Sequence, residues 1–247
     1  MPAGGEPHRD EPHRSEPHGD EPHDSEPQGD ELYDVMRCAP STRNFTAEPV
    51  GREELERVLD NARYAPSGGN RQGWRVIVIT DRDIRRRLRE LYQEPWDAYM
   101  VRTGGRAALD AGEASGLPAA RLRSLRGADE YARRFDEVPV HLLVGVDVNA
   151  LAITDESLER PSIVGGASIY PFVQNLLLGL RREGLGAAFT TLLVPAEPAI
   201  RELLAIPEEI ALAGHISVGH RADPWPKRLS RRPVSEFAFG DRYGQPW

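Results

Sequence analysis

Four apolar runs of strand length, with no hairpin turn joining any two of them, limit how this chain can fold. The runs are WRVIVIT (74–80), VPVHLLVGVD (138–147), GAAFTTLL (186–193) and IALAGHISVGH (210–220). Segments with the helical spacing of apolar residues stand between them, so helix and strand alternate along the chain. Because each sheet face and each helix stripe must be covered by another layer, this order predicts a three-layer α+β or α/β fold.

Helical periodicity accounts for most of the remaining chain. It predicts helices at 31–38, 51–65, 81–92, 161–184 and 196–205. The helix at 161–184 should be the longest, should be buried on several sides and should kink at Pro171. Residues 39–50 are expected to form an ordered loop, and residues 224–239 an extended arm.

Residues 93–137 differ in composition and pattern from the rest of residues 32–247. They combine charged helical pieces with Gly104-Gly105 and a run of small residues from Gly112 to Ala120. We interpret this segment as an insertion that covers a site. The aromatic residues at its border, which could roof a bound ring but in helices more often pack against neighbours, are Tyr92, Trp96 and Tyr99.

The first 31 residues form a separate segment that contains a five-residue repeat. From Glu6 they read EPHRD, EPHRS, EPHGD, EPHDS and EPQGD, and they hold ten acidic and two basic residues. This segment therefore carries the whole net charge of −8, and residues 32–247 have equal numbers of acidic and basic residues. With a proline in every unit and almost nothing apolar, the segment is expected to be disordered.

Four histidines in this repeat raise the alternative of a weak metal site. In an extended chain His8, His13, His18 and His23 would stand roughly 15 Å apart. Chelation would require the chain to fold back at each proline, so we favour a solvating role and predict no resident metal.

Export and membrane spanning are not expected. The sequence has no apolar core of signal-peptide type and no run of about 18 apolar residues. Cys38 is the only cysteine, which excludes an intramolecular disulfide and a multi-cysteine zinc site and favours a cytoplasmic home, with Cys38 as a packed side chain. Because the body is neutral, the charge gives no indication of nucleic-acid binding.

Polar loops at three places indicate where a ligand would bind. APSGGNRQGW (65–74) sets two glycines and an amide before a buried strand, and STR (41–43) and KRLSRRP (227–233) are basic clusters at opposite ends of the body. A basic cluster alone is most often solvated surface. Together with the end of the FTTLL strand, these loops indicate a phosphate-binding site and a flat ring held by backbone and amide donors. The GxGxxG, GxxxxGK[ST], HExxH and GxSxG patterns are absent.

Four stretches in this order resemble the motifs of FMN-dependent nitroreductases. They are STRNF (41–45), APSGGNRQGW (65–74), QNLLLGLRREGLG (174–186) and KRLSRRPVSEF (227–237), and the likeness covers about residues 32–240. The resemblance implies an α+β, nitroreductase-like three-layer sandwich, with a central, mostly antiparallel sheet flanked by helices and a domain-swapped C-terminal arm. It also implies a homodimer with FMN at the interface.

The resemblance assigns cofactor-binding roles to named positions. Ser41, Thr42 and Arg43 would hold the phosphate and the N1/O2 edge of the flavin, where a fixed cation stabilises the charge that reduction leaves. Gly69 would let the backbone approach the ring, and Asn70 and Gln72 would contact its pyrimidine edge. Thr191 and Leu192 would face the N5/O4 side.

The phosphate site departs from the family pattern at one position. The family commonly has an arginine where this chain has Ala39. Arg231 or Arg232 matches the family's late basic residue at the phosphate, and we expect Arg37 or Arg71 to replace the missing one. His220 is a weaker candidate for a contact, and His141 and His215 are expected to be satisfied histidines of the core.

The resemblance implies a ping-pong reaction in which NAD(P)H reduces the flavin and a nitroaromatic, a quinone or a similar acceptor then oxidises it. No side chain need act as acid or base, because the cofactor carries the chemistry. Three alternatives stay open: a reductive dehalogenase, a flavin-consuming oxygenase, and a flavin-binding redox module without turnover. The sequence does not identify the acceptor or choose between NADH and NADPH.

Overall fold

The computed structural model describes residues 30–247 and contains a four-stranded sheet in the order β1-β2-β4-β3. All three strand pairs are antiparallel. The strands are β1 (Trp74–Ile79), β2 (Val140–Asp147), β3 (Leu185–Thr190) and β4 (Ile210–His220). Each coincides with one of the four predicted runs, although β3 begins one residue before its run, and this confirms the α+β class and the antiparallel sheet. The expectations for residues 1–29, including the four repeat histidines, lie outside the described residues.

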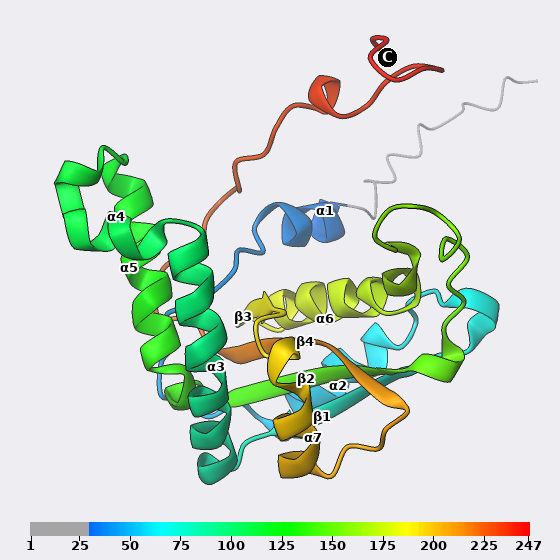
Figure 1. Ribbon diagram of the computed structural model, residues 1–247, viewed down its shortest axis with the longest axis horizontal. Helices are drawn as coiled ribbons and strands as arrows, with labels where there is room; N and C mark the ends of the chain where they lie inside the picture. The colour runs from blue at the N-terminus through cyan, green and yellow to red at the C-terminus, as the bar shows by residue number, and fades with distance from the viewer. Residues whose placement is uncertain (1–29) are drawn as a thin grey trace, which may run out of the picture.

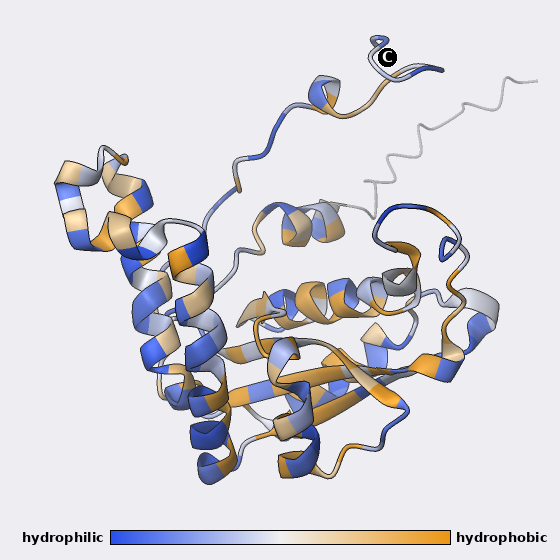
Figure 2. Ribbon diagram, in the orientation of Figure 1, coloured by the Kyte–Doolittle hydropathy of each residue, from blue (hydrophilic) through white to orange (hydrophobic). Residues whose placement is uncertain are grey.

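Helices cover both faces of the sheet and complete the three layers (Figure 1). On one face lie α2 (Arg52–Ala62) and α6 (Tyr170–Arg182), which pack against strand residues such as Val144. On the other face lie α3 (Arg82–Arg102), α5 (Ala119–Arg133) and α7 (Glu197–Leu204), which pack against residues such as Leu143. Neighbouring strand residues point to opposite faces, so the continuous apolar strands in Figure 2 supply both cores.

Helix α3 runs ten residues beyond its predicted end. Asp81 caps it by accepting hydrogen bonds from the backbone nitrogens of Asp83 and Ile84, both at 2.9 Å. The helix then continues through Pro95, although proline removes one backbone hydrogen bond there. Leu88, Tyr92, Trp96 and Met100 repeat every four residues and are all buried. Burial of this stripe outweighs the local cost of the proline, so the expected end at residue 92 was wrong.

The predicted long helix at 161–184 was also wrong. Helix α6 begins only at Tyr170, residues 164–168 form a short 3-10 turn, and the longest helix is α3. Pro171 lies in the first turn of α6 and does not kink it, because the backbone N–H that proline lacks has no helical partner at that position. Strand β3 likewise ends at Thr190, and the next three residues form a turn.

The start of the C-terminal arm lies beside the end of helix α1 (Asp30–Arg37). This helix leads into the loop at 38–50, and the backbone nitrogen of Leu229 donates to the carbonyl of Arg37 at 2.7 Å. From there the C-terminal arm extends away from the sheet (Figure 1), and its Phe237 and Trp247 are exposed. No helix among residues 30–247 combines the length and the apolar character that crossing a bilayer requires.

Candidate functional site

Residues 41–43 lie along the free edge of β3. Ser41 forms a bridge with Ala187, and the backbone nitrogen of Thr42 donates to the Ala187 carbonyl at 2.7 Å. The Thr42 side chain is fully buried and its hydroxyl accepts a hydrogen bond from Arg221 at 3.2 Å. A Cβ atom at Gly186 would come within 2.7 Å of Thr42 Cγ2, so glycine is needed for this contact. Thr42 therefore positions its neighbours and has no surface to offer a ligand.

Arg43 lines a cavity of about 370 Å³ between the end of β3 and the helices α3 and α5. Thr191 and Leu192 line the same cavity, so the structure brings these three predicted residues together. The other residues of the wall are Tyr92, Trp96, Tyr99, Arg102, Tyr131, Ala188, Phe189 and Thr190. No carboxylate is among them, and Arg43 forms no ion pair within residues 30–247.

The aromatic wall is held in place by Asp129 on α5. Its carboxylate accepts a hydrogen bond from Trp96 Nε1 at 2.9 Å and pairs with Arg106 and Arg133. Burial alone would raise the pKa of this carboxyl, but the hydrogen bonds from Trp96 and the two guanidinium groups outweigh that effect and lower the pKa. Asp129 thus stays charged and joins α3 to α5.

The tyrosines of the wall remain protonated near neutral pH. Burial raises the pKa of Tyr92 to about 12 and raises that of Tyr131 further. The Tyr131 hydroxyl lies 2.7 Å from the Ser217 hydroxyl, beneath the cavity. Both side chains are buried, so they contribute rings to the cavity wall, and neither hydroxyl is suited to give up a proton near neutral pH.

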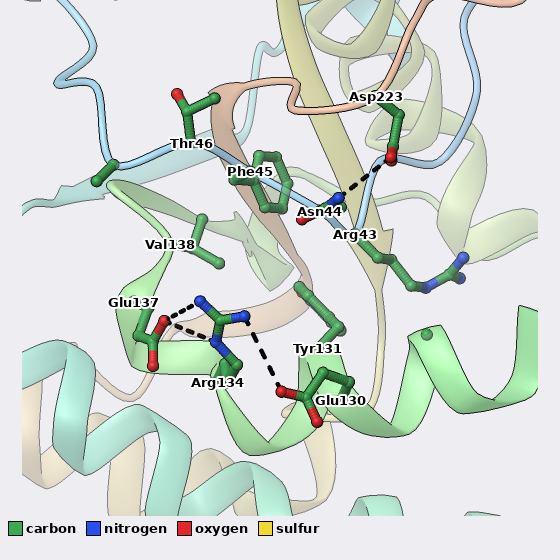
Figure 3. A pocket seen from close by; sticks show the side chains of 12 residues that line it. Arg43, Asn44, Phe45, Thr46, Glu130, Tyr131, Arg134, Glu137, Val138 and Asp223 are labelled. Atoms are coloured by element: carbon green, nitrogen blue, oxygen red, sulfur yellow. Dashed lines mark hydrogen bonds and ion pairs between the residues drawn. The ribbon is translucent and has the colours of Figure 1, made fainter.

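A second cavity, of about 480 Å³, lies on the other side of Arg43 and is shown in Figure 3. Its charged side chains pair with one another or with neighbours: Arg134 binds Glu137 and Glu130, and Asp223 accepts a hydrogen bond from Asn44 at 3.1 Å. The Arg43 guanidinium points away from the Arg134 group in this view. The Arg43 guanidinium therefore does not join the charged groups of this second cavity.

A third, small cavity of about 70 Å³ contains Ser41 and Arg181. The Arg181 guanidinium lies 4.0 Å from the centre of the Trp225 ring. It donates from Nε to the Cys38 carbonyl and from Nη2 to Cys38 Sγ, each at 3.2 Å. These bonds use two of its five N–H groups and leave others for an anion. Ala39 lines this cavity too, so Arg181 stands where the missing arginine was expected.

The arginines predicted for the phosphate are outside these cavities. Arg37 lies near Asp34, at 3.5 Å, and Arg232 lies 3.8 Å from Glu236. Arg231 donates to the carbonyl of its neighbour Ser230. All three side chains are largely solvent-exposed, and Arg181 was missed because its sequence position, in the last turn of α6, reads as a helix end.

The loop with Gly69, Asn70 and Gln72 has a defined, unusual backbone. The φ angles of these residues are 58°, 53° and 50°, in the left-handed region that glycine and asparagine tolerate best. The Ser67 hydroxyl accepts from the Gln72 nitrogen at 3.0 Å, and Gln72 Nε2 donates to Asn70 Oδ1 at 3.1 Å. Three such residues so close together indicate a loop that is held in one shape, as at binding sites.

This loop lies at the opposite end of the sheet from Ser41 and Arg43. Trp74 pairs with Val146 and, through it, stands in register with Ala211, whereas Ala187 pairs with Val218. Three strand spacings and seven residues along β4 separate Trp74 from Ala187, the residue beside Ser41, by roughly 25 Å. Figure 1 shows β3 at the left of the sheet and the start of β1 at the right. Residues 69–72, which include the predicted phosphate ligand Arg71, therefore do not reach the Arg43 cavity of the same chain.

The chain is similar to known proteins in sequence and in fold. The chain is 28% identical to iodotyrosine deiodinase 1 of Rattus norvegicus over 77% of its own length, but it spans only 62% of that relative. It is 29% identical to 4-nitrobenzoate reductase of Nocardioides sp., covering 83% of this chain and 87% of the relative. A solved nitroreductase with bound FMN from Desulfitobacterium hafniense has a similar fold, with a TM-score of 0.55 at 21% identity over 81% of this chain and 94% of that one. Residues 40–220 match the model of the nitroreductase family, and the chain belongs to that family.

Proposed function

We propose that this protein is an FMN-dependent oxidoreductase that passes electrons from NAD(P)H to a small aromatic or quinone acceptor. The observation that carries the proposal is the cavity of about 370 Å³ with aromatic walls and no carboxylate, where the Arg43 guanidinium has no ion pair among the described residues. An unpaired cation facing an aromatic cavity fits a flat, electron-rich ligand whose negative charge grows during the reaction. Family membership supports the same assignment.

The residues present fit FMN in three respects. Arg43 offers a cation to the pyrimidine edge of the ring, and Ser41 with Arg181 offers a hydroxyl and a cation to the phosphate. At the turn after β3, the Leu192 N–H already binds the Thr190 hydroxyl at 3.2 Å, which leaves the Thr191 N–H as the donor for the ring. When bound, FMN would supply the two-electron chemistry. Arg43 would stabilise the added charge, and the aromatic wall would exclude water.

We further propose that one site is completed by two copies of the chain. Residues 69–72 stand next to the start of β1, where Trp74 lies roughly 25 Å from Ala187 within one chain, counted by strand spacing. In a dimer with twofold symmetry, the loop at 69–72 of each copy could reach the Arg43 cavity of the other. The exposed apolar residues of the arm, including Phe237 and Trp247, fit an arm that crosses to the partner. Residues 93–137 would cover the site.

Absorption spectroscopy of the purified protein tests the proposal. We expect a flavin spectrum, with or without added FMN, that bleaches on anaerobic addition of NADPH or NADH. It should recover when nitrobenzene or a quinone is added, because reduction of a nitro group to nitroso takes up two electrons and two protons and releases water. A colourless protein that binds no added FMN would overturn the assignment.

Reductive dehalogenation is a second candidate, favoured by the 28% identity to rat iodotyrosine deiodinase 1. Replacement of an aryl iodine by hydrogen takes up two electrons and one proton and releases iodide. Iodide release from 3-iodotyrosine by the reduced protein, compared with reduction of nitrobenzene under the same conditions, decides between the two acceptors.

A further inference from the structure

A second guanidinium that has no counter-charge among residues 30–247 lines the aromatic cavity. Arg102 is the last residue of α3, and its Cζ lies 5.8 Å from the centre of the Tyr99 ring. It forms no ion pair within residues 30–247. Arg43 and Arg102 are the charged residues of the cavity wall, so the cavity carries two positive charges and no negative one.

The helix end explains why a cation is favourable at position 102, but it does not explain why Arg102 forms no ion pair among the described residues. A cation in the last turn is favourable for any helix. Nearby carboxylates, however, pair elsewhere: Asp97 binds Arg106 at 2.7 Å, and Asp129 binds Arg106 and Arg133. Arg102 also borders a shallow surface depression that contains Glu90, Glu94 and Asp97, but none of these forms an ion pair with it. Its charge is therefore available to a ligand.

The remaining walls define the shape of that ligand. Tyr92, Trp96, Tyr99 and Tyr131 present rings to the cavity, and Asp129 fixes Trp96. Such walls favour a flat aromatic molecule. If Arg43 serves the flavin, Arg102 is left for the molecule that enters next. A guanidinium binds a carboxylate through two parallel hydrogen bonds, which gives direction as well as affinity.

We propose that Arg102 selects electron acceptors that carry a carboxylate on an aromatic ring. The proposal rests on the proposed function, since it concerns the acceptor of the same site. Arg102 would bind the carboxylate at the mouth of the cavity and so direct the opposite end of the ring inward. An uncharged analogue of the same shape would lose this contact and bind more weakly.

Kinetics with a matched pair of acceptors test the proposal on the FMN-saturated protein. The pair is 4-nitrobenzoate and its methyl ester, which carry the same nitro group. We expect Arg102→Gln to raise KM for 4-nitrobenzoate roughly 10- to 100-fold and to leave KM for the ester unchanged. Arg102→Lys should restore part of the difference. Arg123→Gln, on α5 and exposed outside the cavity, is the control and should change neither value.

Two further measurements separate the possible failures. Calorimetric titration of benzoate into the oxidised holoenzyme should show binding that Arg102→Gln abolishes, with an unchanged melting temperature. In stopped-flow experiments, Arg102→Gln should leave flavin reduction by NADPH unchanged; a slower reduction would assign Arg102 to the donor and overturn the inference. Equal losses for acid and ester would overturn it too. A wild-type protein that reduces a quinone but neither nitro compound would overturn the inference alone, and one that binds no FMN would overturn the proposed function and the inference with it.

Discussion

Arg181 connects three parts of the molecule at a single side chain. It reaches from α6 to the Cys38 carbonyl, stacks on Trp225 of the arm and lines the small cavity beside Ser41. In the sequence it is one of several basic residues at a helix end, and its distance from Ser41 depends on how α6 packs beside β3. Arg181 lies within the stretch QNLLLGLRREGLG, but nothing in that stretch marks it as a site residue. Arg43, Thr191 and Leu192 were predicted from the sequence to belong to one site, and they line one cavity.

We predict that Arg181→Gln weakens FMN binding by a factor of roughly 10 to 100, the range for a charge-assisted hydrogen bond. Riboflavin, which lacks the phosphate, should bind equally well to both proteins. Fluorescence-quenching titrations of the apoprotein with each ligand measure this. Arg182→Gln, which removes only an exposed pair with Glu31, is the control. Equal losses for FMN and riboflavin would mean that Arg181 acts only through the local fold.

At the scale of elements, the strands were predictable and the helix ends were not. The four apolar runs predicted the strands because a strand buried on both faces is a short run of consecutive apolar residues, which can be recognised locally. The end of α3 depends on a buried stripe that continues past Pro95, and the start of α6 depends on a turn at 164–168. Both are decided by tertiary packing, which local propensity does not contain.

The pairing of β2 with β4 places two histidines against each other in the core. His141 Nδ1 lies 2.7 Å from His215 Nε2, both residues are fully buried, and Phe135 packs on both rings. Burial lowers the pKa of His141 to about 3, with a further contribution from Arg85, and lowers that of His215 well below its usual value. The outer nitrogens, His141 Nε2 and His215 Nδ1, have no hydrogen-bond partner among the described residues. The two histidines lie in the core as predicted, but only one nitrogen of each ring is hydrogen-bonded.

We predict that this pair makes the fold sensitive to mild acid. The unfolded histidines bind protons below pH about 6.5, whereas the folded pair stays neutral until far lower pH. The free energy of unfolding should therefore be constant above pH 7 and fall as the pH drops, by about 2 kcal/mol for each histidine at pH 5. Urea unfolding from pH 8 to pH 5 measures it. His215→Gln should remove about half of the slope in this window; an unchanged slope would contradict the assignment.

For the whole molecule, the proposed site requires two loops that lie far apart in one chain to contact the same ligand. The loop at 69–72 and the residues Ser41 and Arg43 lie at opposite ends of the antiparallel sheet. Sequence motifs indicated that both belong to the site, but a linear sequence does not say which copy of the chain supplies each. The strand register separates the loops within one chain, and this separation supports the proposal that two copies of the chain complete the site.

Mixed dimers test this division of the site. In a twofold dimer each site takes Arg43 from one copy and Asn70 from the other. Arg43→Gln and Asn70→Asp, which keeps a residue type that tolerates the left-handed backbone, should each abolish flavin binding as homodimers. In a heterodimer of the two variants both defects fall in one site and the second site is intact. Purified heterodimers carrying two different tags should therefore hold about half the FMN and show about half the activity of the wild type. If a single chain supplied both loops, each site of the heterodimer would keep one defect and no flavin would bind.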